Sequence, residues 1–267
     1  MDNNRNAYYW KGKELRTKTA KEHTVEMQNL FAKEIDKCVK DSKIYGENAA
    51  CVSNEFLDNI ALKEQQIKVV PEDSVKAIFN YADGITAVLN FASYKYPGGG
   101  FMAGSRAQEE CLCHESFLYN VLSSERLQKE FYDWNGKNLN HGLYKDRLIY
   151  SPDVIFQRNG EYIKCNVITC AAPNKYVAQN YQNISNEENR IALKARLLWI
   201  MKAAAANNVQ TLILGAFGCG VFGQDPTEVA EVCKELLDEH KWFNNVIFAI
   251  IPSFHEQNLA KFQEILK

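Results

Sequence analysis

The sequence predicts an α/β protein in which helices cover both faces of a central sheet, as three α/β/α layers. Apolar runs of strand length alternate along the chain with longer segments of helical periodicity. Neither internal repeats nor low-complexity linkers interrupt this alternation. Alternation of this kind is typical of a layered α/β/α domain. The 267 residues are enough for one large domain with a substantial core and an accessory segment.

An N-terminal helical accessory segment is expected to precede the main domain. Residues 17–41 are polar on one face and carry apolar residues at helical spacing, which predicts a helix. The apolar stripe that we expect to face the domain consists of Val25, Leu30, Phe31, Ile35 and Val39. We therefore divide the chain into an accessory segment, residues 1–60, and a main domain, residues 61–267.

The remaining elements follow from periodicity, capping residues and turn signals. Pro71-Glu72-Asp73 is typical of a helix start, and Arg158-Asn159-Gly160-Glu161 resembles the turn of a hairpin. Predicted strands cover residues 67–70, 85–92, 148–156, 162–170, 211–216 and 246–251. Predicted helices cover residues 74–81, 108–122, 123–134, 186–205, 226–239 and 255–266.

The composition indicates a soluble globular protein, with 46% hydrophobic and 24% charged residues. No apolar run approaches the length of a membrane span, and residues 1–15 lack the apolar core of a signal peptide. Eight cysteines without a secretory signal indicate reduced thiols, so we expect a cytoplasmic protein. The net charge of −2 gives no basic footprint for sequence-specific nucleic-acid binding.

Three consecutive glycines, Gly98–Gly100, follow the strand predicted at residues 85–92. Glycine permits dihedrals closed to other residues and lets a ligand approach the main chain closely. After a gap of seven residues come Gln108, Glu109 and Glu110, at the expected start of a helix. Ligands of open α/β sheets bind in loops at the carboxyl ends of strands. Each feature alone also occurs in ordinary loops and helix starts, but together they indicate a site where a substrate is bound and cleaved.

A second glycine-rich segment, residues 215–223, lies between a buried strand and a helix and contains Gly215, Gly218, Gly220 and Gly223. Free backbone N–H groups beside a helix N-terminus suit a diphosphate without any lysine. Tight packing explains such glycines about equally well. The spacing is neither that of a P-loop nor that of a dinucleotide-binding fingerprint.

The run Cys111-Leu112-Cys113-His114 contains metal-ligating residue types. On a helix, Cys111 and His114 share a face but Cys113 points elsewhere, and the chain has no second cysteine pair at zinc-ligand spacing. We therefore expect packing here and no metal. Four further cysteines lie in apolar stretches and are expected to be small buried hydrophobes, namely Cys38, Cys165, Cys170 and Cys233.

Taken together, these motifs resemble the microbial-type poly(ADP-ribose) glycohydrolases, a branch of the macrodomain fold. The signature of that family is Gly-Gly-Gly, six to eight residues, then Gln-Glu-Glu, and the gap here is seven. Further similar blocks, spread over residues 60–255, are Leu89–Ser93, Tyr150–Val154, Ile168–Asn174 and Leu214–Gly223. The resemblance implies a macrodomain-like catalytic domain with a mixed central sheet in residues 61–267, and no cofactor.

The resemblance also implies roles for individual residues. Glu110 corresponds to the general acid/base of the family, and Glu109 to a residue that positions ribose hydroxyls. Phe222 corresponds to the aromatic residue that packs against the distal ribose, although a core anchor for its loop is an alternative. Phe217 stands where relatives often have Trp. The predicted ADP-ribose-binding residues are Asn90, Gly98, Gly99, Gly100, Gln108, Gly218, Cys219, Gly220, Val221, Phe222 and Gly223.

The assignment of Glu110 as a general acid sets a requirement on its pKa. A helix N-terminus favours the charged carboxylate, whereas an acid must hold a proton near neutral pH. We expect the like charge of Glu109 and the bound diphosphate to raise the pKa of Glu110, mainly in the complex.

The function that the resemblance implies is hydrolysis of the ribose–ribose O-glycosidic bond at the end of poly(ADP-ribose), which releases ADP-ribose. One alternative is hydrolysis of mono-ADP-ribose from a protein or nucleic acid. Another is a macrodomain that only binds ADP-ribose, although such a protein needs no acid pair. A metal hydrolase built on Cys111, Cys113 and His114 is a fourth hypothesis.

Overall fold

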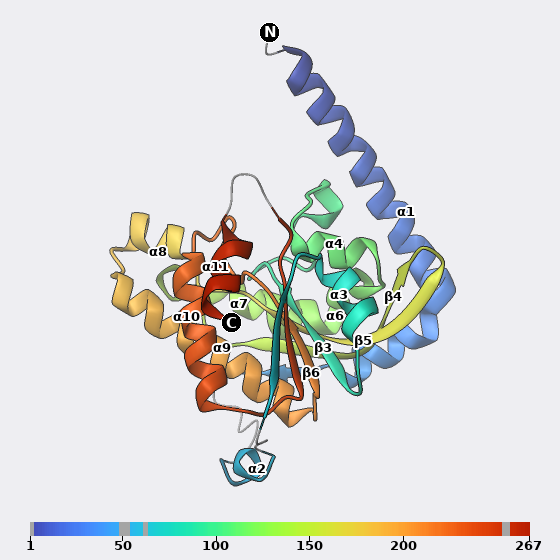
Figure 1. The fold of residues 1–267 in the computed structure, drawn as a ribbon. Coiled ribbons are helices and arrows are strands. Elements are labelled where there is room, and N and C mark those ends of the chain that lie inside the picture. The colour runs from blue at the N-terminus through green and yellow to red at the C-terminus, as the bar shows by residue number, and fades with distance from the viewer. Residues whose placement is uncertain (1–2, 48–53, 61–63, 253–256) are drawn as a thin grey trace.

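The computed structural model describes residues 3–47, 54–60, 64–252 and 257–267, and places a seven-stranded mixed sheet between two layers of helices (Figure 1). The strand order is β1-β4-β5-β3-β6-β7-β2. The strands are β1 (Lys43–Tyr45), β2 (Gln66–Val70), β3 (Thr86–Phe91), β4 (Leu148–Arg158), β5 (Glu161–Cys170), β6 (Thr211–Leu214) and β7 (Asn245–Ala249). Pairing is antiparallel for β1–β4–β5 and parallel for the rest. The predicted fold class is confirmed.

Each face of the sheet has its own hydrophobic core. One core packs α9 (Asn186–Ala206), α10 (Pro226–Glu239) and α11 (Asn258–Ile265) on the sheet. The other packs α1 (Asn3–Asp41), α3 (Ser74–Tyr81), α4 (Gln108–His114) and α5 (Leu118–Leu122) on the opposite face. Side chains of a strand alternate between faces, so Ala87 and Leu89 of β3 enter the first core and Val88 the second. Asn90 therefore points to the face that α4 covers.

The N-terminal helix α1 contains the predicted helix but starts earlier, at Asn3, and has non-helical dihedrals at Phe31. The predicted apolar stripe is correct at Ile35, which is buried, but wrong at Val25 and Leu30, which are 61% and 55% exposed. The buried positions of this stretch instead include the small residue Ala20, the polar residue His23 and Met27. His23 Nε2 lies 2.9 Å from the carbonyl oxygen of Ser116, so a tertiary hydrogen bond selects the face that packs.

The division into an accessory segment and a main domain stays a prediction, and residues 61–63 at its boundary lie outside the described residues. The structure adds that residues before this boundary contribute to the sheet. β1 pairs antiparallel with β4, with Ile44 opposite Ile149.

The long helix predicted over residues 108–122 is wrong in one respect, because it breaks into α4 and α5. Ser116 lies in the break, where its Oγ donates to the Leu112 carbonyl (2.6 Å) and accepts from the Leu118 N–H (3.0 Å). Ser116 also forms an isolated antiparallel bridge with Phe156 of β4. A serine that satisfies backbone groups in this way competes with helix continuation.

The other elements agree with the prediction apart from their ends. The helix predicted over residues 123–134 is α6 (Glu125–Leu127), a π-helical turn and α7 (Asp133–Lys137). The strands predicted at 85–92, 211–216 and 246–251 end earlier, at Phe91, Leu214 and Ala249. The start predicted for the last helix, His255, lies outside the described residues, and α11 begins at Asn258. The sequence analysis missed β1, α2 (Asn54–Asn59) and α8 (Lys175–Gln182).

Four parallel strands, β3, β6, β7 and β2, end at the same edge of the sheet. The segments that follow them begin at Ala92, Gly215, Ile250 and Pro71. Loops at the carboxyl ends of parallel strands are the usual place for a ligand in such sheets.

Candidate active site

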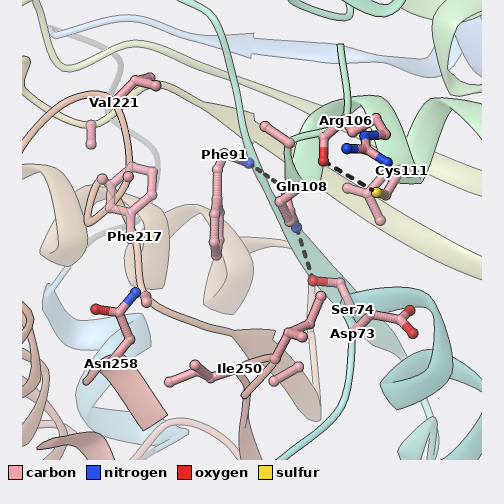
Figure 2. Close-up of a pocket in the computed structure, with 18 of the residues that line it drawn as sticks. Asp73, Ser74, Phe91, Arg106, Gln108, Cys111, Phe217, Val221, Ile250 and Asn258 are labelled. Atoms are coloured by element: carbon pink, nitrogen blue, oxygen red, sulfur yellow. Dashed lines mark hydrogen bonds between the residues drawn. The ribbon is translucent and has the colours of Figure 1, made fainter. Parts of the chain in front are cut away.

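A cavity of about 440 Å³ opens at this edge of the sheet (Figure 2). Phe91 from β3 and Phe217 from the loop after β6 stand in its walls, with ring centroids 5.7 Å apart. Asp73 and Ser74 line it from the start of α3, and Ile250 from the segment that follows β7. Of the predicted binding residues, Gln108, Gly218, Gly220, Val221 and Phe222 line this cavity.

The first glycine loop, Gly98–Gly100, lies against the carboxyl pair, Glu109 and Glu110. Gly98 and Gly99 have φ values of +65° and +57°, a region that favours glycine. A Cβ atom at Gly99 would stand 2.7 Å from an oxygen of each carboxyl group. Glycine is therefore needed at position 99 both for its dihedrals and for the space that the carboxyl pair occupies.

Glu109 is 3% exposed and is held by the strand that precedes the loop. Its Oε1 accepts from Asn90 Nδ2 at 3.2 Å, and its Oε2 accepts from the Ser93 N–H at 2.7 Å. Burial raises the pKa of Glu109 to about 8, and the like charge of Glu110 adds to this, against the two hydrogen bonds. Burial thus favours the protonated form of Glu109 over the carboxylate.

Glu110 is also buried, and only one of its oxygens has a partner. Oε1 accepts from the Gly100 N–H at 2.7 Å. Oε2 is buried and has no hydrogen-bond partner among the described residues. A buried polar atom without a partner is rare in a folded protein and calls for an explanation. Here it is the oxygen of Glu110 that no group of the described residues engages.

Gln108 fixes the helix that carries the carboxyl pair. Its side chain acts like a further strand residue, since Oε1 accepts from the Phe91 N–H (2.9 Å) and Nε2 donates to the Leu89 carbonyl (2.9 Å). Nε2 also lies 3.0 Å from Ser74 Oγ. The N-cap position Ala107 offers no side-chain hydrogen bond to α4. The helix is therefore held by its docking on β3.

The second glycine loop, Gly215–Gly223, is anchored to α9 and has open space beside Gly220. Gly218 (φ +78°) and Gly223 (φ +71°) adopt left-handed dihedrals. The buried side chain of Gln224 exchanges two 2.9 Å hydrogen bonds with Asn189 of α9, which holds the loop in place. Gly220 has nothing within 4 Å of an added Cβ. The loop thus presents its main chain to the cavity.

Cys219 and Val221 differ in their surroundings although both lie in the second glycine loop. Val221 is 89% exposed at the cavity rim. Cys219 is partly buried, with its Sγ 3.9 Å from the Phe217 carbonyl. Cys219 and Gly223 do not line the cavity, and neither do Asn90, Gly98–Gly100 or the carboxyl pair, which lies behind the first glycine loop.

Phe222 leads to an aromatic group that the sequence analysis missed. Its ring centroid lies 6.0 Å from that of Tyr144, which stacks on Tyr94 at 4.1 Å with an angle of 7° between the ring planes. Tyr94 follows β3 closely in sequence, but Tyr144 lies in a polar stretch without strand or helix periodicity. No local signal connects the two, so only the fold could reveal the stack.

The side chains of Cys113 and His114 in the run Cys111–His114 make packing contacts. Cys113 is fully buried, and the His114 ring contacts Phe101 edge-on at 4.6 Å between centroids. Cys111 lines the cavity. In the part of the chain that the structure describes, no group of three His, Cys, Asp or Glu residues could hold a metal ion.

Among the helices of the described residues, none combines the length and the apolar character that a membrane span requires.

Comparison with known proteins now adds to this geometry. The model of the microbial-type PARG catalytic domain, PARG being poly(ADP-ribose) glycohydrolase, matches residues 13–159, which include the first glycine loop and the carboxyl pair. The chain belongs to the microbial-type poly(ADP-ribose) glycohydrolase family. This is a family of glycosidases that hydrolyse poly(ADP-ribose), and the chain is such a glycosidase.

Solved glycohydrolase structures agree with this assignment. The enzyme from Thermomonospora curvata is 30% identical, with a TM-score of 0.82 over 94% of this chain and 99% of that chain. The enzyme from Deinococcus radiodurans in complex with ADP-ribose is 31% identical, with a TM-score of 0.79 over 87% and 96%. A Thermomonospora curvata structure bound to the inhibitor ADP-HPD has a TM-score of 0.78 over 94% and 99%, with 31% identity. No curated protein matches the chain.

Proposed function

We propose that this glycohydrolase cleaves the ribose–ribose O-glycosidic bond at the end of poly(ADP-ribose) and releases ADP-ribose, with Glu110 as the general acid/base. The observation that carries the proposal is the buried, unpartnered Oε2 of Glu110 beneath the first glycine loop. The family assignment supplies the substrate class. A cytoplasmic location is part of the proposal and is supported by the free thiols of the described cysteines.

The carboxyl pair divides the chemistry between its members. Cleavage passes through an oxocarbenium-like state in which the leaving oxygen needs a proton. The two carboxyl groups lie side by side at Gly99, and the like charge of Glu110 adds to the burial that raises the pKa of Glu109. In our proposal the proton that the carboxyl pair holds reaches the leaving ribose oxygen through Glu110 Oε2, and Glu110 then activates the attacking water. Glu109, held by Asn90 and the Ser93 N–H, positions a ribose hydroxyl.

The cavity then holds the rest of the ADP-ribose unit. Its apolar walls around Phe91 and Ile250 suit the adenosine. The backbone of Gly218–Gly223 suits the diphosphate, since its glycines leave N–H groups accessible. Phe222 at the end of this loop packs on the distal ribose, backed by Tyr144. In this proposal the ligand extends from the cavity toward the carboxyl pair behind the first glycine loop.

The test is release of ADP-ribose from poly(ADP-ribose) by wild type and by Glu110→Gln, with ADP-ribose binding measured by calorimetry. We expect Glu110→Gln to lower release by about 10²–10⁴-fold, the usual range for a general acid, and to retain binding. The matched control is Glu187→Gln, which changes an exposed glutamate in the first turn of α9 and should act like wild type.

Two results would contradict the proposal. Undiminished release by Glu110→Gln would remove Glu110 from the chemistry. Binding of ADP-ribose without release from the polymer by wild type would exclude the polymer as substrate, and mono-ADP-ribosylated protein would then be tested.

A further inference from the structure

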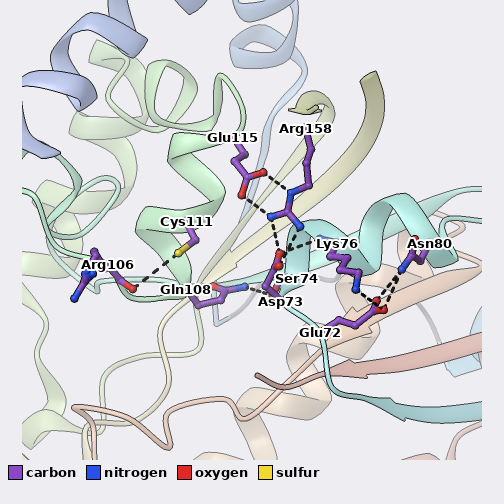
Figure 3. A network of polar contacts seen from close by, with 10 residues as sticks. All are labelled: Glu72, Asp73, Ser74, Lys76, Asn80, Arg106, Gln108, Cys111, Glu115 and Arg158. Carbon is purple, nitrogen blue, oxygen red and sulfur yellow. Dashed lines mark hydrogen bonds and ion pairs between the residues drawn. The ribbon is translucent and has the colours of Figure 1, made fainter. Parts of the chain in front are cut away.

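A fork of ion pairs centred on Arg158, the last residue of β4, connects two parts of the site (Figure 3). Nη1 and Nη2 donate to the two carboxylate oxygens of Asp73, at 3.0 and 2.8 Å. Nε and Nη2 donate to the two carboxylate oxygens of Glu115, both at 2.6 Å. Arginine is suited to such planar, bidentate pairs, and lysine is not.

One arm of the fork ends in the wall of the cavity. Asp73 lines the cavity and caps α3, since its Oδ1 accepts from the Lys76 N–H at 2.9 Å. Burial raises the pKa of Asp73, but the hydrogen bonds from Arg158 and from the Lys76 N–H lower it by more. The net pKa lies below the usual value for aspartate, so the carboxylate stays charged. Ser74, the next residue, also lines the cavity and meets Gln108 at the start of α4.

The other arm ends on the helix of the carboxyl pair. Glu115 directly follows α4, and its carbonyl also accepts from the Gln157 N–H at 2.8 Å. α4 has seven residues and no side-chain cap at its start. A helix this short has little stability of its own, so its position depends on tertiary contacts. These are the core packing of Leu112 and Cys113, Gln108 at one end and Glu115 at the other.

The start of α3 is therefore tied to both ends of α4. Gln108 connects it to the first residue of α4, and Arg158 connects it to the residue after the last. A displacement of Asp73 or Ser74 by a ligand in the cavity must then be passed on to α4, because packed elements move as units.

From this geometry we propose that Arg158 is a positioning residue, which couples the wall of the cavity at Asp73 to the placement of Glu109 and Glu110. It acts through Asp73 and Glu115, and neither ligand nor reacting atoms need touch it. In this way, adenosine bound in the cavity sets the carboxyl pair for the distal ribose. This inference rests on the proposed function for the roles of cavity and carboxyl pair.

The test compares the affinities for ADP and ADP-ribose, both by calorimetry, in wild type and Arg158→Gln. ADP lacks the distal ribose. The dissociation constant for ADP divided by that for ADP-ribose therefore reports the contacts of the distal ribose, including those at the carboxyl pair. We expect Arg158→Gln to reduce this ratio by roughly 5–30-fold, the usual range of a coupling between sites. We expect kcat for polymer to fall by a similar factor, with less change in KM.

The matched control is Arg190→Gln. Arg190 also pairs with two carboxylates, those of Glu231 and Glu235 of α10, and is 29% exposed against 24% for Arg158. This control should leave the affinity ratio and kcat as in wild type. Glu115→Gln weakens the ion pair of Arg158 that lies outside the cavity, and it should also lower the affinity ratio. This second variant tests the proposal if Arg158→Gln does not fold.

An unchanged affinity ratio in both Arg158→Gln and Glu115→Gln, with only a lower melting temperature, would overturn the proposal and leave a structural ion pair. So would an equal loss of affinity for ADP and ADP-ribose. Failure of the proposed function has a different signature, because wild type would then bind ADP-ribose without releasing it from polymer, and the affinity ratio would still be readable.

Discussion

The two glycine loops of this enzyme differ in what occupies the space beside their glycines. In the first glycine loop, the space that a side chain would take at Gly99 is filled by the protein itself, 2.7 Å away in both Glu109 and Glu110. In the second, the corresponding space at Gly220 is open, with nothing within 4 Å. Glycine thus lets the backbone approach catalytic side chains in one loop and a ligand in the other.

This difference teaches how to separate chemistry from binding. A change in the first glycine loop displaces the carboxyl pair and should reduce catalysis. A change in the second leaves the carboxyl pair where it is and should weaken binding of the diphosphate. The loops also differ in support, because Gly100 binds Glu110 directly, whereas the second loop is held by the buried amide pair of Asn189 and Gln224.

The largest effect is expected from Gly99→Ala. The added methyl group must displace both carboxyl groups, and φ of +57° is unfavourable for alanine. Misplaced catalytic groups commonly cost about 100-fold in rate, so kcat for release of ADP-ribose should fall by at least about that factor. The control is Gly160→Ala in the β4–β5 turn, which also has a positive φ (+83°) but nothing near its Cβ. If both variants lose the same activity, backbone strain alone explains the loss and the contrast between the loops fails.

The next effect concerns stability and sharpens the account of the first glycine loop. Glu109 has a folded-state pKa of about 8, against 4.5 for an exposed glutamate. The folded state therefore binds more protons between these values, and the free energy of unfolding falls as the pH rises through this window. Glu109→Gln removes that loss, so it should stabilise the protein by on the order of 2–5 kcal/mol at pH 9 and by little at pH 4.

Urea unfolding of Glu109→Gln and wild type at several pH values measures this difference. Asn90 offers an unpartnered Oδ1 that can accept from the new amide, so the variant should keep its hydrogen bonds. The exposed-site variant Glu187→Gln should show no such pH dependence. A stability gain that is the same at pH 4 and pH 9 would mean that Glu109 is ionised in the folded protein.

A smaller loss is expected from Gly218→Ala in the second glycine loop. The new Cβ would lie 2.7 Å from the Cβ of Ala172, and the alanine backbone would have to adopt a φ of +78°. Strain of this kind costs about 1–3 kcal/mol, so the melting temperature should fall and the affinity for ADP-ribose should drop by roughly tenfold. With saturating substrate, kcat should stay closer to wild type than in Gly99→Ala. A selective loss of kcat would reverse the roles of the two loops.

The smallest effect is expected from Gly220→Ala. Its Cβ meets nothing in the protein and its φ is not positive, so stability should change by less than about 0.5 kcal/mol. The methyl group enters the cavity where we place the diphosphate, so ADP-ribose affinity should fall by roughly 3–10-fold. Calorimetry and thermal unfolding test this together. Unchanged affinity would place the diphosphate elsewhere.

The sequence predicted those features whose causes are local. The bounds of α3 and α10 were predicted correctly because each begins with a capping aspartate, Asp73 and Asp225. Pro226 directly follows Asp225 at the first position of α10, and Pro71 lies two residues before Asp73. The β4–β5 hairpin follows from Asn159-Gly160, both with positive φ. The carboxyl pair and both glycine loops were found from spacing and family resemblance together.

Features that depend on distant partners could not be predicted. The buried face of α1 is chosen partly by the contact of His23 with Ser116, 93 residues away. The break between α4 and α5 coincides with the bridge from Ser116 to Phe156. Arg158 belonged to an ordinary turn in the sequence, and its fork to Asp73 and Glu115 exists only in the folded chain. The raised pKa of Glu109 was not expected either, because no spacing rule reveals the burial that causes it.

The most direct test of the central claim, that Glu110 protonates the leaving oxygen, varies the leaving group. We would compare Glu110→Gln with wild type on poly(ADP-ribose) and on an ADP-ribose that carries 4-nitrophenol at C1 of the distal ribose. A nitrophenolate leaves without protonation, so the variant should lose about 10²–10⁴-fold on polymer but less than about tenfold on the aryl substrate. Equal losses on both substrates would contradict the claim and leave Glu110 only the activation of the water, or binding and positioning.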